Sequence, residues 1–256
     1  MEIGGKKCIA KGIICVILGP RTYMKFLCIS DDTDTLIYSP SSKERYKDVD
    51  LVLSAGDLPI RYYDYISTVM NKDLYYVYGN HNLEYFSRNM GRFGSENVLQ
   101  SNSASQIAEA TSTHGGGMIV DGTGIYDKQR DLIIMGLGGS MLYNYGESQY
   151  TEKQMKKRIM RLIPRLLYNK QRYGRYVDIL ITHAPPRGIG DGEDLCHRGF
   201  ECFLSFMEKY KPKYLLHGHV HLFDENEKRE TKYMDTTVIN VYKNYILEDD
   251  TLGVRK

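Results

Sequence analysis

The sequence predicts an α/β fold that contains pairs of parallel strands. Its first indication is a set of apolar runs of strand length, rich in β-branched and aromatic residues, which is typical of strands buried on both faces. The second is a helical pattern over residues 59–72 between two of these runs, an order that implies parallel strands joined by a right-handed crossover. The runs are Phe26–Ile29, Leu51–Ala55, Leu74–Tyr78, Val177–Ile181 and Tyr214–Leu216.

Each apolar run leads into a short loop that carries carboxylate, amide or imidazole side chains. Two divalent ions about 3.5–4 Å apart need such ligands to clamp a phosphoryl group. Strand ends supply the rigid mounting, and the glycines at 56, 79 and 218 allow sharp turns next to the ligand residues. The loops are Ser30–Asp34, Gly56–Asp57, Gly79–His81, Thr182–Pro186 and Gly218–His221.

In this order the motifs resemble the calcineurin-like metallophosphoesterase family, from Met24 to about Asn240. The Thr182–Pro186 turn favours small stand-alone members of bacterial type. The resemblance implies a four-layer α/β/β/α sandwich of two mixed sheets, with a dinuclear metal site at the strand ends. It also implies metal-dependent hydrolysis of phosphomonoesters or phosphodiesters, by in-line attack of a hydroxide that the metals hold.

The resemblance also implies a role for each motif residue. Asp57 would bridge both metals, Asp31 would bind the first metal with His221, and the second metal would be bound by Asn80, His183 and His219. His81 would bind no metal and would protonate the leaving oxygen, for which a pKa near neutrality is suited. The predicted catalytic residues are therefore His81 and Asp57.

The first motif departs from the family, which usually has Asp-x-His there. If Asp31 is the first ligand, the histidine position holds Thr33 and Asp34 follows; if Asp32 leads, Asp34 takes that position. We favour Asp31, with Asp34 as a nearby ligand. An oxygen ligand in place of the usual histidine favours hard ions at the first site, so we expect two divalent ions, Mn²⁺ before the alternatives Mg²⁺, Fe and Zn²⁺.

Substrate contacts are predicted in the loop after His183. There Arg187 is placed to clamp a phosphate bidentately, and His197 to contact substrate, with local loop structure as an equal alternative for each. Residues 87–117 are small and polar, which indicates a long excursion beside the site, and His114 within it is expected to be a solvated loop residue. The glycine-rich run 136–140 suits phosphate binding and turn geometry equally.

The remaining segments complete the expected organisation. Residues 1–23 are an N-terminal extension or extra strand, with a hairpin over 8–18 that turns at Gly19–Pro20, and 24–256 form the phosphoesterase domain. Residues 36–48 are expected to be irregular. Thr151 and Gln154 indicate a capping box at the start of a long helix that Pro164 kinks. A helix over 200–210 and two closing strands over 237–247 follow.

Composition limits the partners. The 256 residues carry 34 basic and 32 acidic side chains, so charge favours neither a nucleic-acid nor a membrane partner, and a small phosphoester is the expected substrate. The five cysteines lack metal-type spacing, which indicates reduced thiols and a cytoplasmic location. No apolar run reaches the length of a membrane span. Oligomeric state is not indicated.

Two other functions compete with a phosphoesterase of small substrates. A nuclease would need a basic groove with stacking aromatic residues, which balanced charge and single-domain length disfavour. A non-catalytic scaffold on the same fold would be expected to lose Asp57 or the Asn80–His81 pair, and both are present. The altered first motif keeps the scaffold as an alternative.

Overall fold

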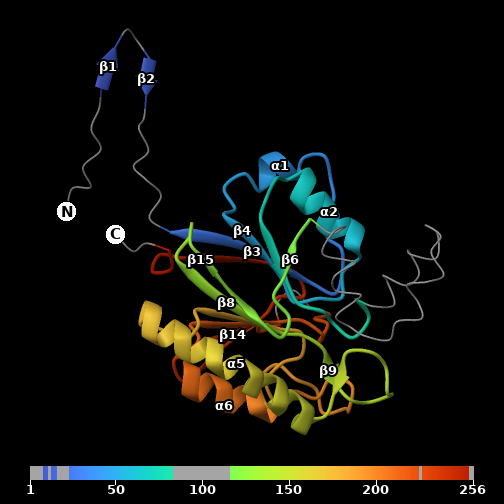
Figure 1. The fold of residues 1–256 in the computed structure, drawn as a ribbon. Coiled ribbons are helices and arrows are strands. Elements are labelled where there is room, and N and C mark those ends of the chain that lie inside the picture. Colours follow the sequence, from blue (N-terminus) through green and yellow to red (C-terminus); the bar gives the residue numbers. More distant parts are fainter. Residues whose placement is uncertain (1–7, 11–12, 16–22, 83–115, 225–226, 254–256) are drawn as a thin grey trace, which may run out of the picture.

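The structure is a computed structural model, and it describes residues 8–10, 13–15, 23–82, 116–224 and 227–253. Two mixed sheets pack face to face in it, with helices on both outer sides (Figure 1). The expected four-layer α/β/β/α sandwich is therefore confirmed. Among the described helices, none combines the length and the apolar character needed to cross a bilayer.

The first sheet has the strand order β15-β3-β4-β5-β6. The pairs β3–β4, β4–β5 and β5–β6 are parallel, whereas β15 runs antiparallel to β3 at the edge. Helix α2 connects β4 to β5, so the predicted crossover unit is present. The strands are β3 (Met24–Ser30), β4 (Leu51–Ser54), β5 (Leu74–Tyr76), β6 (Met118–Ile119) and β15 (Lys243–Asp249).

The second sheet has the order β13-β14-β12-β11-β8-β7, with four parallel central strands and an antiparallel strand at each edge. The two closing strands predicted over 237–247 thus divide between the sheets, because β14 joins the second and β15 the first. The strands are β7 (Gly124–Asp127), β8 (Leu132–Leu137), β11 (Ile179–Thr182), β12 (Tyr214–His217), β13 (Glu230–Tyr233) and β14 (Thr236–Asn240).

Four described helices cover the sheets. Helices α1 and α2 lie on the outer side of the first sheet, and α5 and α6 on the outer side of the second (Figure 1). Residues 36–48, expected to be irregular, contain the single turn α1. The predicted capping box is confirmed, since Thr151 and Gln154 bond each other's backbone at the start of α5. The helices are α1 (Ser42–Arg45), α2 (Ile60–Thr68), α5 (Glu152–Tyr173) and α6 (Glu201–Tyr210).

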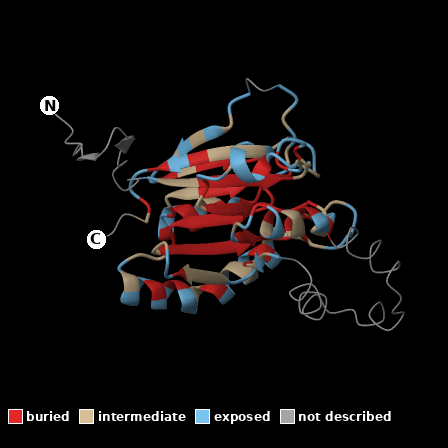
Figure 2. Cartoon of the chain, turned by 90° about the horizontal axis from the view of Figure 1, so that it is seen from above, coloured by how far each residue is buried: buried red, intermediate tan, exposed pale blue. Residues whose placement is uncertain are grey.

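Three apolar cores hold the four layers together. The central core joins the two sheets through residues such as Phe26 and Ile179, and each outer core joins one sheet to its helices, through Tyr62 on one side and Phe203 on the other. Figure 2 shows this burial concentrated in the strands. Burial of one such side chain stabilises the fold by about 1.5–3 kcal/mol, so the sheets form a rigid mount for the loops at their ends.

Two short strand pairs complete the fold. Strands β1 (Cys8–Ala10) and β2 (Ile13–Cys15) pair in antiparallel, and the predicted turn at Gly19–Pro20 lies outside the described residues. Strands β9 (Ser140–Met141) and β10 (Gln149–Tyr150) pair in parallel and bracket a loop beside the candidate site. Most of the predicted excursion over 87–117, with His114, lies outside the described residues.

Candidate metal centre and active site

The carboxyl ends of β3, β4 and β11 bring three predicted ligands together. Donor atoms of Asp31, Asp57 and His183 all lie within 4.8 Å of one another. His183 Nε2 is 3.2 Å from Asp57 Oδ2 and 2.9 Å from Asn80 Oδ1. The ring of His219 lies 4.8 Å from that of His183, between centroids. Five of the seven predicted metal ligands therefore converge on one place.

Backbone geometry at these residues turns the side chains inward. Asp31, Asp57 and His219 have φ values of 63°, 54° and 66°, in the left-handed region that non-glycine residues rarely adopt. Such conformations are costly and cluster at functional sites, where the surrounding fold imposes them. Gly79 is required for a different reason: a Cβ there would lie 2.1 Å from Asp57 Oδ1 and 2.7 Å from His183 Cε1.

Each nitrogen-containing ligand is oriented by a hydrogen bond at its other polar atom. His183 Nδ1 donates to the Ala55 carbonyl (2.8 Å), which leaves Nε2 directed at Asp57 and Asn80. His219 Nε2 donates to the Cys196 carbonyl (2.7 Å), which leaves Nδ1 without that proton. Bonds of this kind fix the tautomer and ring orientation of metal-binding histidines.

The amide of Asn80 is oriented in the same way. Its Nδ2 donates to the Tyr143 hydroxyl (3.2 Å), so Oδ1 faces His183. Sequence patterns did not predict the contact of Tyr143 with Asn80, which lies 63 residues earlier in the chain. They also did not predict the role of Asn82, whose Oδ1 accepts the N–H groups of Asp57 (2.7 Å) and Gly79 (2.6 Å) and so joins two of the loops. The position of Asn82 beside Asn80–His81 was the available signal.

Burial and mutual charge shift the pKa values in the centre. Burial lowers the pKa of His183, but the nearby Asp57 and Asp31 carboxylates outweigh it and raise that pKa to about 9. Burial opposes ionisation of Asp57, yet His183 holds its pKa below the usual value. Burial, together with the Asp57 charge, raises the pKa of Asp31. The two buried carboxylates of Asp31 and Asp57 lie close together, so a positive charge between them would be stabilised.

Two predicted ligands lie apart from this cluster. Asp34 is buried, and its carboxylate accepts hydrogen bonds from Leu36 N (2.7 Å) and from the Asn244 amide. His221 is exposed and stacks on Tyr242, with 4.7 Å between ring centroids. The pKa of Tyr242 is raised, mainly by burial and in addition by the nearby charges of Asp32 and Asp31. His221 therefore lies on the Asp31 side of the centre.

The two predicted substrate residues occupy the loop after β11. Arg187 Nη1 is paired with Asp191 Oδ2 (2.7 Å) and Arg187 Nη2 with Glu193 Oε2 (3.3 Å), so its guanidinium braces its own loop. The ring of His197 lies 5.4 Å from that of His219, and its Nδ1 is 2.9 Å from Asp194 Oδ2. His197 thus borders the metal centre.

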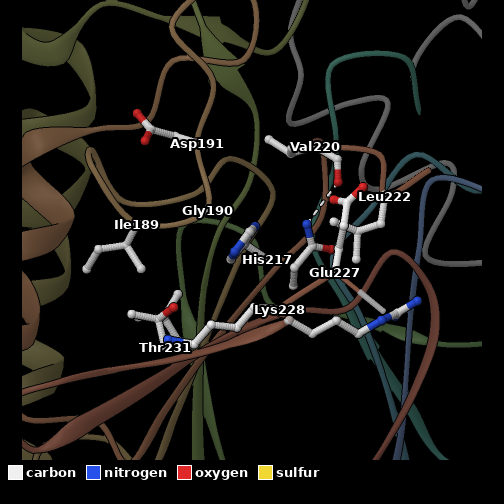
Figure 3. Close-up of a pocket in the computed structure, with 12 residues that line it drawn as sticks. Ile189, Gly190, Asp191, His217, Val220, Leu222, Glu227, Lys228 and Thr231 are labelled. Carbon is white, nitrogen blue, oxygen red and sulfur yellow. Dashed lines mark hydrogen bonds between the residues drawn. The ribbon is translucent and has the colours of Figure 1, made fainter. Parts of the chain in front are cut away.

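His81 lies at the rim of the centre. Its backbone N–H donates to Asp57 Oδ1 (2.8 Å), and its side chain is exposed beside a cavity of about 350 Å³. His217 belongs elsewhere, although it is two residues from His219. It lines a separate cavity of about 240 Å³ with Gly190 and Lys228 (Figure 3), and burial lowers its pKa to about 4.

Solved structures share this fold. One has a TM-score of 0.59 and 15% sequence identity, with 88% of this chain and 95% of that chain covered. The TT1561 protein of Thermus thermophilus has a TM-score of 0.53 and 14% identity, covering 86% and 89%. The phosphopantetheinyl hydrolase PptH of Mycobacterium tuberculosis has a TM-score of 0.46 and 13% identity, covering 88% and 90%.

No curated protein sequence matches the chain. The family model of the calcineurin-like phosphoesterases, however, matches residues 25–223, which include all the converging ligands described above. The chain belongs to the calcineurin-like phosphoesterase family.

Proposed function

We propose that this protein hydrolyses phosphomonoesters or phosphodiesters with the help of two divalent metal ions. The observation that carries the proposal is the convergence of Asp31, Asp57 and His183, whose donor atoms lie within 4.8 Å of one another at the ends of strands from both sheets. Carboxylates and an imidazole in this arrangement suit a pair of divalent ions, whose positive charge would take the place of the proton on His183. Family membership supports the same reaction class.

The residues present fit such ions. Asp31, Asp57, Asn80, His183 and His219 would hold them, because hydrogen bonds to Ala55, Cys196 and Tyr143 aim the histidine and amide donors into the centre. When bound, the ions would withdraw charge from the phosphoryl oxygens and make a water nucleophilic. The oxygen-rich Asp31 side favours Mn²⁺ or Mg²⁺. His221 and Asp34 remain predicted ligands of the metal ion next to Asp31.

His81 is the proposed general acid. The bond from its backbone N–H to Asp57 fixes the main chain next to the centre, while its exposed imidazole borders the 350 Å³ cavity. A leaving oxygen that departs toward the cavity would thus meet the His81 ring. Proton donation by a positioned histidine contributes roughly 10²–10⁴-fold to such reactions.

Arg187 and His197 are proposed substrate contacts. His197 is close to the centre through its contact with His219, whereas Arg187 would have to exchange its partners Asp191 and Glu193 for a phosphate. The small phosphoester substrate and the cytoplasmic location belong to the same proposal. The free thiols of Cys28, Cys196 and Cys202 support the location, because reducing compartments keep thiols unpaired.

The first experiment compares Asp57→Asn with Asp178→Asn. Both carboxylates are 6% exposed, but Asp178 pairs with Arg175 and lies outside the metal cluster. We expect metal-dependent hydrolysis of an aryl phosphate or its diester by the wild type and by Asp178→Asn, with loss in Asp57→Asn and after chelation. Folded protein that hydrolyses neither ester in Mn²⁺, Mg²⁺, Fe²⁺ or Zn²⁺ would favour the scaffold.

The second experiment tests His81. In His81→Ala, esters with a poorly leaving alkoxide should lose about 10²-fold in kcat/KM, whereas nitrophenyl esters, which need little protonation, should lose far less. The measurement is the dependence of kcat/KM on the pKa of the leaving alcohol. An equal loss for all leaving groups would contradict the general-acid role while leaving the metal centre in place.

A further inference from the structure

A cavity of about 350 Å³ adjoins the candidate acid. Asn80 and His81 form one end, and the other is formed by Tyr143, Asn144, Gly146 and Glu147, which precede β10, and by Gln149, its first residue. The Tyr143 hydroxyl accepts a hydrogen bond from the Asn80 side-chain amide at the boundary between the cavity and the candidate metal centre. A leaving group that takes its proton from His81 would occupy this cavity, so its walls determine which alcohol fits.

The loop that forms the wall is braced from within. Gln149 Oε1 accepts the backbone N–H groups of Tyr143 (3.1 Å) and Asn144 (3.2 Å), and Gln149 Nε2 donates to Asn144 Oδ1 (2.6 Å). Asn144 Oδ1 also accepts Gly146 N (3.1 Å). Both polar side chains are therefore engaged in holding the loop. The wall is built before a substrate arrives, which lowers the ordering cost of binding.

The charge of the wall is acidic. Apart from His81, the ionisable groups among the described residues that line the cavity are the Glu147 carboxylate and the Tyr143 phenol, and none of these lining residues is Lys or Arg. A leaving group with its own phosphate or carboxylate would find no cationic partner among these described lining residues. An ammonium group would meet the Glu147 carboxylate and an aromatic ring, both of which attract cations.

We propose that this cavity is a leaving-group site for a positively charged alcohol, so that the substrate is a phosphate ester of an amino or quaternary-ammonium alcohol. This inference rests on the proposed phosphoesterase function and adds the class of its leaving group. Glu147 supplies the charge selection, and the Tyr143 ring supplies the aromatic wall. The same chemistry disfavours nucleic-acid substrates, whose leaving strand carries further phosphates.

The test uses three alcohols of similar size, each as its phosphate monoester and its methyl phosphodiester. Choline is the cation, 3,3-dimethylbutanol is its neutral isostere, and 4-hydroxybutyrate is the anion. We expect kcat/KM for the choline ester to exceed that of the neutral ester by about fivefold, as one exposed charge contact allows, and the anionic ester to be slowest. Choline esters no faster than the neutral isostere would overturn the proposal.

A variant pair assigns the selection to Glu147. Glu147→Gln is expected to bring the choline-to-neutral ratio of kcat/KM close to one, whereas Glu44→Gln, an exposed change on α1, should leave the ratio as in the wild type. An unchanged ratio in Glu147→Gln would also overturn the proposal. Turnover of the neutral ester without charge preference refutes this inference alone, whereas no metal-dependent turnover of any ester refutes the proposed function with it.

Discussion

Gly79 is the position where one added methyl group should disable the candidate metal centre although no candidate ligand is replaced. In Gly79→Ala the new Cβ would lie 2.1 Å from Asp57 Oδ1 and 2.7 Å from His183 Cε1, whereas ordinary contacts begin near 3.4 Å. Both neighbours are held by the fold, since His183 is bound to the Ala55 carbonyl and Asp57 accepts the His81 N–H. The Asp57 carboxylate would therefore have to move by about 1.3 Å.

A displacement of about 1 Å in a catalytic group costs roughly 10²-fold in rate, or about 2.7 kcal/mol of transition-state stabilisation. We expect kcat/KM on an aryl phosphate to fall by that factor, with weaker Mn²⁺ binding by titration calorimetry. The control is Gly174→Ala, where the Cβ meets open space at a φ of 76°. That change should cost about 1–2 kcal/mol of stability and leave turnover intact.

A Gly79→Ala protein that kept Mn²⁺ affinity and kcat/KM within about threefold of the wild type would contradict the expected displacement of Asp57, which should cause a much larger loss. Thermal unfolding of both variants separates a local effect from loss of the fold. A Gly79→Ala protein that unfolds near the wild-type temperature yet binds no Mn²⁺ would place the damage in the centre itself.

Two further predictions concern hydrogen bonds. Tyr143→Phe removes the acceptor of Asn80 Nδ2 and should lower Mn²⁺ affinity about fivefold, the value of one neutral hydrogen bond. The control Tyr145→Phe, at a residue 90% exposed, should keep the wild-type affinity. Equal Mn²⁺ affinities of the two variants in titration calorimetry would contradict the role of Tyr143. Burial opposes ionisation of Asp249, but Lys213, Tyr214 and the N–H groups of Thr251 and Leu252 lower its pKa to about 2. The ionised Asp249 therefore stabilises the folded state fully above about pH 5, and this contribution fades as pH falls toward about 2. Urea unfolding should show Asp249→Asn about 1–2 kcal/mol less stable than the wild type at about pH 7 and nearly as stable at about pH 2. The control Asp250→Asn should unfold like the wild type at both pH values. A loss of stability in Asp249→Asn that persists at the lower pH would contradict the role of the Asp249 charge.

Local sequence patterns were enough to predict the main strands and the positions of the candidate ligands. Strand-length apolar runs predicted β3, β4, β5, β11 and β12, because burial on both faces requires apolar residues throughout a strand. The candidate ligands Asp57, Asn80 and His183 lie in the loops that follow such runs. Since neighbouring parallel strands of one sheet end at the same edge, the loops of Asp57 and Asn80 had to be close in space. The capping box at Thr151 was equally local and equally predictable.

Only the tertiary structure decided how the side chains meet. Asp34 is separated by 210 residues from Asn244, which binds its carboxylate, and His183 reaches across from the second sheet to Ala55 of the first. Tyr143 and Glu147 line the cavity beside the centre, from the connection between β9 and β10. Periodicity reports which face of an element is buried, whereas the pairing of distant loops depends on how two sheets pack. That packing is set by the apolar cores rather than by the polar residues that it brings together.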